Sequence, residues 1–110
     1  MTKIAMSAAA SGLLRALVGR AGVERDRILL TKIQSTDWQS LTFAGERHEI
    51  GFRIRGSGAD AIATRLTQEV EHAEFAIPGH IVADVLVTSP ARDDGDGSIS
   101  VELEALTIAE

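Results

Sequence analysis

The sequence predicts an α+β fold, a two-layer sandwich in which two helices cover one face of a four-stranded antiparallel sheet. Two segments carry apolar residues at helical spacing, and each is followed by two segments with the alternation or β-branched composition of strands. The order α-β-β-α-β-β is that of one αββ unit used twice, with halves at residues 1–56 and 57–110. A chain of 110 residues has room for a single domain.

The first helix is predicted over residues 5–20. Its apolar residues recur at positions that form one stripe along a helix, so this stripe must pack against another element. Gly19 and Gly22 lie where the stripe ends and supply a stop signal. The stripe consists of Met6, Ala9, Ala10, Leu13, Leu14, Leu17 and Val18.

The first pair of strands is predicted within residues 27–55, and its turn has two candidate positions. In one interpretation the chain turns at Ser35–Asp37. In the other, one long, kinked strand covers residues 27–43 and turns at Ala44-Gly45. Ala-Gly is not a preferred pair for a two-residue turn, so composition alone does not decide between them.

Facial alternation favours the long strand. A turn at Ala44-Gly45 pairs Phe43 with Glu46 and Leu41 with His48. Because cross-strand partners share a face of the sheet, this pairing gathers the apolar residues of both strands on one face. The residues gathered there are Leu29, Ile33, Leu41, Phe43, Ile50, Phe52 and Ile54.

The second helix is predicted over residues 58–74. Ser57 supplies an N-cap, and Asp60 three positions later completes a weaker form of the capping box. Pro78-Gly79 interrupts the chain before the next strand. The apolar stripe of this helix consists of Ala59, Ile62, Ala63, Leu66, Val70 and Ala73.

The second pair of strands is predicted over residues 80–109. A polar turn rich in Asp and Gly, residues 89–97, joins them. The last strand begins with clean alternation, but Leu106 and Ile108 break it. This break predicts a bulge or bend near Ala105.

The sheet face opposite the helices is the strongest candidate for function. Apolar side chains on that face, including the only Trp, more often mark an interface than a solvated surface. We therefore expect a homodimer or a higher homo-oligomer, unless the helices or the long loop cover this face. The expected interface residues are Leu30, Trp38, Val82, Leu86, Leu106 and Ile108.

Charge and composition argue against several classes of partner. The formal net charge of −5 divides into +4 over residues 1–55 and −9 over residues 56–110. This asymmetry is typical of a domain with a large dipole, or of a surface that complements itself between subunits. The arginines are scattered and only four residues are aromatic, so we expect no nucleic-acid partner. No apolar run approaches the length of a membrane span, so a cytoplasmic location is predicted.

The inventory of reactive side chains is thin. The chain has no Cys, which excludes thiolate chemistry and disulfides, and no His spacing of the kind that binds metals. No cofactor or metal is therefore expected. If the strand at 46–55 neighbours the strand at 80–88, a His, Asp and Glu cluster could gather at one end of the sheet. The candidates are His48, His80, Asp84 and Glu46, with Arg47 or Arg53 orienting an anionic ligand.

These observations predict a small, soluble interaction or oligomerisation module without enzymatic activity. The alternative is a protein that binds a small molecule or metal, or a minor enzyme, using the cluster at the end of the sheet. No motif identifies a substrate, a reaction or a particular partner.

Overall fold

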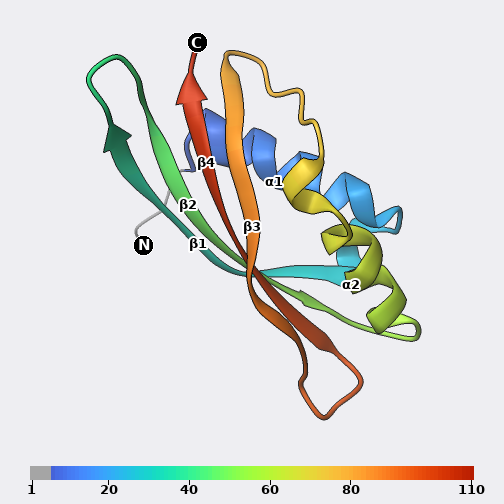
Figure 1. Ribbon diagram of the computed structural model, residues 1–110. Coiled ribbons are helices and arrows are strands. Elements are labelled where there is room, and N and C mark those ends of the chain that lie inside the picture. The colour runs from blue at the N-terminus through green and yellow to red at the C-terminus, as the bar shows by residue number, and fades with distance from the viewer. Residues whose placement is uncertain (1–5) are drawn as a thin grey trace, which may run out of the picture.

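The computed structural model describes residues 6–110 and confirms the predicted α+β fold (Figure 1). Two helices lie on one side of a strongly twisted, open, antiparallel sheet. The elements are α1 (Ala8–Ala21), η1 (Arg25–Arg27), β1 (Ile28–Gln39), β2 (Ala44–Ile54), α2 (Ala59–Thr67), η2 (Val70–His72), β3 (His80–Asp93) and β4 (Ile99–Ala109).

The strand order is β1-β2-β4-β3, with every neighbouring pair antiparallel. This order places β2 and β4 in the centre and leaves β1 and β3 at the edges. In this order, an approximate two-fold axis between β2 and β4 relates the first hairpin to the second. Two αββ units would give this arrangement. Within residues 6–110, no helix is both long and apolar enough to span a lipid bilayer.

Helix α1 follows the predicted pattern closely. The predicted start at residue 5 lies outside the described residues, and the helix begins at Ala8 behind Ser7. The Ser7 hydroxyl accepts the N–H of Ala10 at 3.1 Å, which caps the first turn. The predicted stop is confirmed at Gly22, whose φ of 67° is the left-handed conformation that glycine adopts without strain.

The two helices cap each other at their C-terminal ends. The Arg20 guanidinium of α1 donates to the carbonyl of Leu66 at 3.1 Å, and Arg65 of α2 donates to the carbonyl of Ala21 at 3.0 Å. Each arginine therefore satisfies a carbonyl that the partner helix leaves without an internal donor. This exchange fixes the two helices side by side above the sheet.

Helix α2 is shorter than predicted and is capped differently. It ends at Thr67, because Glu69 takes a left-handed φ of 51° that a continuous helix does not allow. Val70 is nevertheless buried, in the short helix η2 that follows. The N-cap is Gly58 rather than Ser57, and no side chain caps it. The predicted capping box is therefore absent.

The long first strand is present, but its turn lies elsewhere than predicted. The turn residues are Leu41 and Thr42 rather than Ala44-Gly45. The Ser40 N–H donates to the carbonyl of Phe43 at 2.9 Å, and the Phe43 N–H donates to the Ser40 hydroxyl at 3.1 Å. These two hydrogen bonds close the hairpin at Ser40, so Leu41 and Phe43 lie at its tip rather than in the predicted apolar face.

The register of the hairpin follows from this turn. His48 lies opposite Ser35, and Glu46 lies opposite Asp37. Both predicted pairings, of His48 with Leu41 and of Glu46 with Phe43, are therefore wrong.

A β-bulge at Thr31 changes the facing of the residues before it. Leu30 lies opposite Phe52, but Lys32 lies opposite Gly51, so one extra residue is accommodated in β1. Gly51 leaves the room that the bulge needs, because a Cβ there would lie 2.8 Å from the Thr31 hydroxyl.

The bulge reverses the predicted facing of Leu29. Leu29 lies opposite Arg53 and is 49% exposed, on the face away from the helices. Leu30, on the next position, shares the helix-covered face with Phe52.

Strand β4 is regular throughout, without the predicted bulge near Ala105. Its pairing with β2 is continuous from Ile99 to Ile108. Ala105 and Thr107 are buried against the helices, so Leu106 and Ile108 point to the other face by simple alternation.

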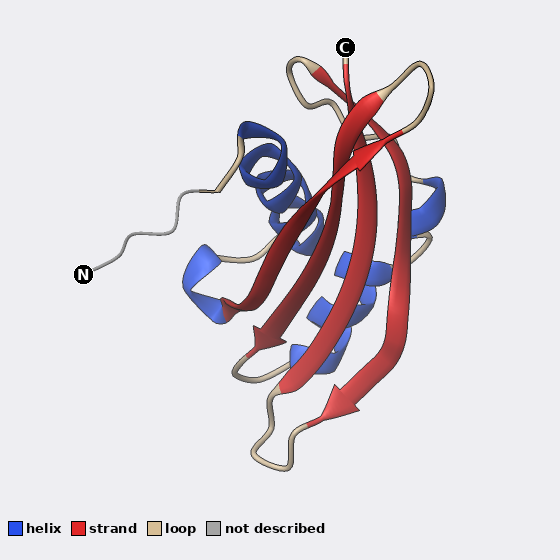
Figure 2. Ribbon diagram, turned by 90° about the vertical axis from the view of Figure 1, so that its left-hand side faces the viewer, coloured by secondary structure: helices blue, strands red, loops and turns tan. Residues whose placement is uncertain are grey.

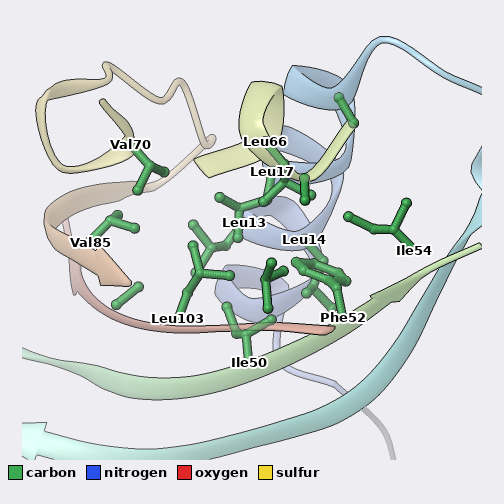
Figure 3. Close-up of a cluster of buried hydrophobic side chains, with 14 of the residues drawn as sticks. Leu13, Leu14, Leu17, Ile50, Phe52, Ile54, Leu66, Val70, Val85 and Leu103 are labelled. Carbon is green, nitrogen blue, oxygen red and sulfur yellow. The ribbon is translucent and has the colours of Figure 1, made fainter. Parts of the chain in front are cut away.

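The hydrophobic core lies between the helices and the two central strands (Figure 3). Leucines of α1 and α2 pack onto the β-branched and aromatic residues that alternate along β2 and β4. Its largest fully buried apolar side chains are Leu13, Leu17, Ile50, Phe52, Ile54, Leu66, Val70, Val101 and Leu103.

Candidate interaction surface

The face of the sheet away from the helices, here called the outer face, is open. Both helices lie on the opposite side of the sheet, and Figure 2 views the outer face with the helices behind it. Because cross-strand partners share a face, the strand registers assign every residue of this face.

One end of the outer face is apolar. A row across the sheet contains Trp38, Gly45, Ile108 and Ile81, each opposite the next. Gly45 lies between Trp38 and Ile108 in this row but has no side chain, so no side chain separates the indole of Trp38 from the side chain of Ile108. We call the apolar residues at this end the apolar patch: Trp38, Ile81, Leu86, Leu106 and Ile108.

The apolar patch is accessible. Ile81 is 52% exposed and Leu86 is 38% exposed, and the other three side chains are half-buried. Single exposed apolar residues are ordinary, but five that gather at one end of a sheet face, one of them a Trp, are a feature of contact surfaces.

The rest of the outer face carries balanced charge. Lys32 pairs with Glu49 at 3.3 Å, and Arg47 pairs with Glu104 at 2.5 Å, each across neighbouring strands. Four basic and four acidic side chains occupy the face, so its net charge is zero although the chain carries −5. These residues are Lys32, Arg47, Arg53, Arg92, Glu49, Asp84, Glu102 and Glu104.

Four of the six interface residues predicted from the sequence lie on this face: Trp38, Leu86, Leu106 and Ile108. Leu30 and Val82 do not. Leu30 lies opposite Phe52, and Val82 lies opposite Thr107 and packs against the core. Both are displaced by β-bulges, after Leu30 in β1 and after Val82 in β3.

The predicted cluster of reactive side chains assembles only in part: Glu46 and His80 lie near enough to His48 to act on the pKa of its imidazole, but Asp84 does not join them. His48 and Glu46 belong to the helix-side face, whereas Asp84 lies opposite Leu106 on the outer face. His80 opens β3, where its Nδ1 lies 3.1 Å from the carbonyl of Pro78. Among residues 6–110, no three His, Cys, Asp or Glu residues lie close enough to hold a metal ion.

The two arginines predicted to hold an anionic ligand also lie on the outer face. Arg47 is occupied by Glu104. Arg53 donates to Asp96 at 2.9 Å and to the Ser98 hydroxyl at 3.0 Å, and it lies 3.5 Å from Asp94. Both guanidinium groups are therefore engaged within the chain, on the face of the sheet opposite the buried His48.

The acidic turn after β3 is organised by its own hydroxyl groups. Asp94 accepts from Ser100 at 2.6 Å, which lowers the pKa of its carboxyl, and nearby Arg53 lowers it further. Hydrogen bonds from Ser98 likewise lower the pKa of Asp96. These carboxylates are stabilised as anions by partners that fix the turn, with Arg53 joining it to β2.

His48 is fully buried, which the sequence analysis did not predict. Its Nδ1 lies 2.7 Å from the Ser35 hydroxyl, and its Nε2 lies 2.8 Å from the Thr107 hydroxyl. Burial lowers the pKa of the imidazole; the carboxylate of Glu46 opposes this and His80 reinforces it. The alternation of His48 with Ile50 and Phe52 was the signal in the sequence that it faces the core.

The arrangement around His48 holds a neutral imidazole between two hydroxyl groups. Such a group can relay a proton between Ser35, which is exposed, and Thr107, which is buried. The two ring nitrogens form hydrogen bonds with these two hydroxyls, and neither partner is a carboxylate that would stabilise an imidazolium. We therefore assign His48 a structural role in joining β1, β2 and β4.

A groove of about 790 Å³ opens where the helices leave β1 uncovered. Its walls are formed by α1, the segment that follows it, and the first residues of β1. The lining is mostly apolar, with Arg15 and Asp26 as its charged residues. Arg15 donates to the Ser11 hydroxyl at 3.0 Å, so it is held along the helix rather than across the groove.

Comparison of the chain with models of known protein families, with curated proteins and with solved structures gives no match. The geometry of the described residues therefore carries the functional assignment.

Proposed function

We propose that the protein is a self-associating interaction module, and that the apolar patch on the outer face binds the same patch of a second copy. The observation that carries this proposal is an uncovered sheet face that combines an apolar end, which includes Trp38, with a net charge of zero. Two chains of charge −5 repel each other, and the outer face is where they can approach without adding to that repulsion.

A second copy fits this face better than a charged partner does. Three basic residues of this face already form ion pairs within their own chain, so an acidic partner is not needed to neutralise them. These residues are Lys32, Arg47 and Arg53. Apolar contact is then the driving force, and a two-fold axis lets one patch serve both subunits. A cytoplasmic location remains a prediction from the sequence.

The test is the mass of the protein in solution, by native mass spectrometry and light scattering, at about 100 μM, far above a micromolar Kd. We expect a multiple of the 11.7 kDa chain. Leu86→Asp places a charge in the patch and should lower the assembly state.

Leu41→Asp is the matched control, because it makes the same chemical change at a fully exposed leucine on the hairpin tip. It should leave the assembly unchanged. A wild-type protein that is monomeric, or an assembly that Leu86→Asp and Leu41→Asp affect equally, would overturn the proposal.

A further inference from the structure

The two edges of the sheet are unequal. Strand β3 has Pro90, which lacks an N–H, and its pairing with β4 shifts register at three places. Prolines and bulges are the devices by which proteins prevent an edge strand from pairing with another chain. Helix η2 also contacts β3. The β3 edge is therefore protected against pairing with a strand of another chain.

Strand β1 lacks these protections over most of its length. From Lys32 to Gln39 it pairs with β2 without a register shift, and this stretch contains no Pro or Gly. Eight residues in regular extended conformation form an edge about 26 Å long. It is long enough to accept a strand.

The hairpin turn identifies the peptide groups that face outward along this edge. Ser40 and Phe43 form a hydrogen-bonded pair. Because hydrogen-bonded and non-hydrogen-bonded pairs alternate along an antiparallel ladder, even-numbered residues of the stretch 32–39 direct their peptide groups toward β2. The N–H and C=O groups of the odd-numbered residues point away from the sheet. These residues are Ile33, Ser35, Asp37 and Gln39.

We infer that this edge of β1 pairs antiparallel with β1 of a second copy. The stretch 32–39 contains one basic residue, Lys32, and one acidic residue, Asp37, near opposite ends. Antiparallel pairing brings the basic end of each strand beside the acidic end of the other, whereas parallel pairing would place like charges together. The edge thus complements itself.

If the two β1 strands pair symmetrically about Ser35, their outward-pointing N–H and C=O groups form hydrogen bonds with each other. Ser35 then faces Ser35 of the second copy, and Ile33 faces Asp37, so these outward-pointing groups form the hydrogen bonds. On the outer face, Lys32 of each copy lies opposite Trp38 of the other, which is a favourable arrangement of a cation and an indole ring. The product is a continuous sheet of two chains.

Edge pairing is independent of contact through the outer face, and the two can coexist. The axis of edge pairing is perpendicular to the sheet, whereas an axis for face contact lies parallel to it. Where two perpendicular two-fold axes intersect, they close an assembly of four chains. The four-chain assembly, unlike the edge pairing itself, rests on the proposed function.

The test uses Asp37→Pro in the full chain. Because the Asp37 N–H points outward, proline removes a donor from the edge without removing a hydrogen bond to β2. Asp37→Asn is the matched control, since it loses the charge but keeps the N–H. Native mass spectrometry should show four chains for the wild type and for Asp37→Asn. It should show two chains for Asp37→Pro, two for Leu86→Asp, and one for the double variant.

Amide hydrogen exchange tests the edge directly in the same samples. In the wild type, the amides of Ser35 and Asp37 should be protected by a factor above about ten, like those of Gln34 and Thr36. In Asp37→Pro, protection of Ser35 should be lost while Gln34 and Thr36 keep theirs, which also shows that the variant is folded.

The failures of the two interfaces are distinguishable. If Ser35 and Asp37 exchange freely in the assembled wild type, or if Asp37→Pro leaves the mass unchanged, edge pairing is refuted. If the wild type is a dimer that Asp37→Pro splits and Leu86→Asp does not, the edge is confirmed and contact through the outer face is refuted.

Discussion

His48 should make the folding stability depend on pH. It is fully buried, and its two ring nitrogens lie within hydrogen-bond distance of the hydroxyls of Ser35 and Thr107. Those hydroxyls could accept bonds from an imidazolium, and the carboxylate of Glu46 favours the charged form. Removal from water nevertheless outweighs both, so the pKa of His48 lies below its ordinary value of 6.5.

The sign of the effect follows from this lowered pKa. Below pH 6.5 the unfolded chain takes up a proton at His48 that the folded chain does not accept. The free energy of unfolding therefore decreases as the pH falls from 6.5 toward the folded pKa, with a slope of at most about 1.4 kcal/mol per pH unit. Below the folded pKa both states bind the proton, and this contribution stops changing.

Urea unfolding between about pH 5 and pH 7.5 measures this slope. His48→Gln keeps a donor and an acceptor for the two hydroxyls but does not titrate, so its unfolding free energy should vary less with pH across this range. His72→Gln is the matched control, because His72 is exposed and its replacement should leave the wild-type slope unchanged. A wild-type slope that His48→Gln leaves intact would refute this account of His48.

Three further predictions concern other parts of the chain. Gly45→Ala should destabilise the protein by about 1–3 kcal/mol in urea unfolding, because its Cβ would lie 1.9 Å from a backbone oxygen of β4. Gly19→Ala should stabilise it by up to about 1 kcal/mol, since the same methyl group meets no atom within 4 Å in helix α1; equal effects of the two substitutions would contradict both predictions. An NMR titration should give the Asp94 carboxyl a pKa below 3.8, and Ser100→Ala should raise it; an unchanged pKa in that variant would remove Ser100 as the main cause.

The sequence was sufficient to predict the fold because each element carries its own periodic signal. The apolar stripe of α1 and its stop at Gly22 are local properties, and so is the alternation along β4 from Val101 to Leu103. Where a local signal is ambiguous, the prediction was wrong. The stripe of the second helix continues to Ala73, yet the helix ends at Thr67 before the left-handed Glu69, and Val70 reaches the same core from η2.

The candidate surface was predicted in part, and both misplaced residues have the same physical cause. Leu30 and Val82 each stand just before a bulge in an edge strand, and one extra residue reverses the face of everything on its far side. Whether a strand can form a bulge depends on the space that the neighbouring strand leaves for it. The space for the bulge at Thr31 is supplied by Gly51 of β2, so the residues of β1 alone do not predict the bulge.

The bulges also decide which apolar residue each edge strand presents to the outer face. Without the shift after Val82, the residues at 82, 84 and 86 would share the outer face, and Val82 would be exposed there. With the shift, Val82 packs against the core and Ile81 takes the outer position opposite Ile108, where it is 52% exposed. The bulge after Leu30 acts in the same way on β1, because it turns Leu30 toward Phe52 and Leu29 to the outer face. Each bulge thus exchanges one apolar side chain for another on the outer face. Leu29 lies opposite Arg53, away from the apolar patch, whereas Ile81 lies in one row with Ile108 and Trp38. The bulge in β3 therefore supplies Ile81 to the end of the outer face that holds Trp38, Leu106 and Ile108, which fits a contact surface at that end.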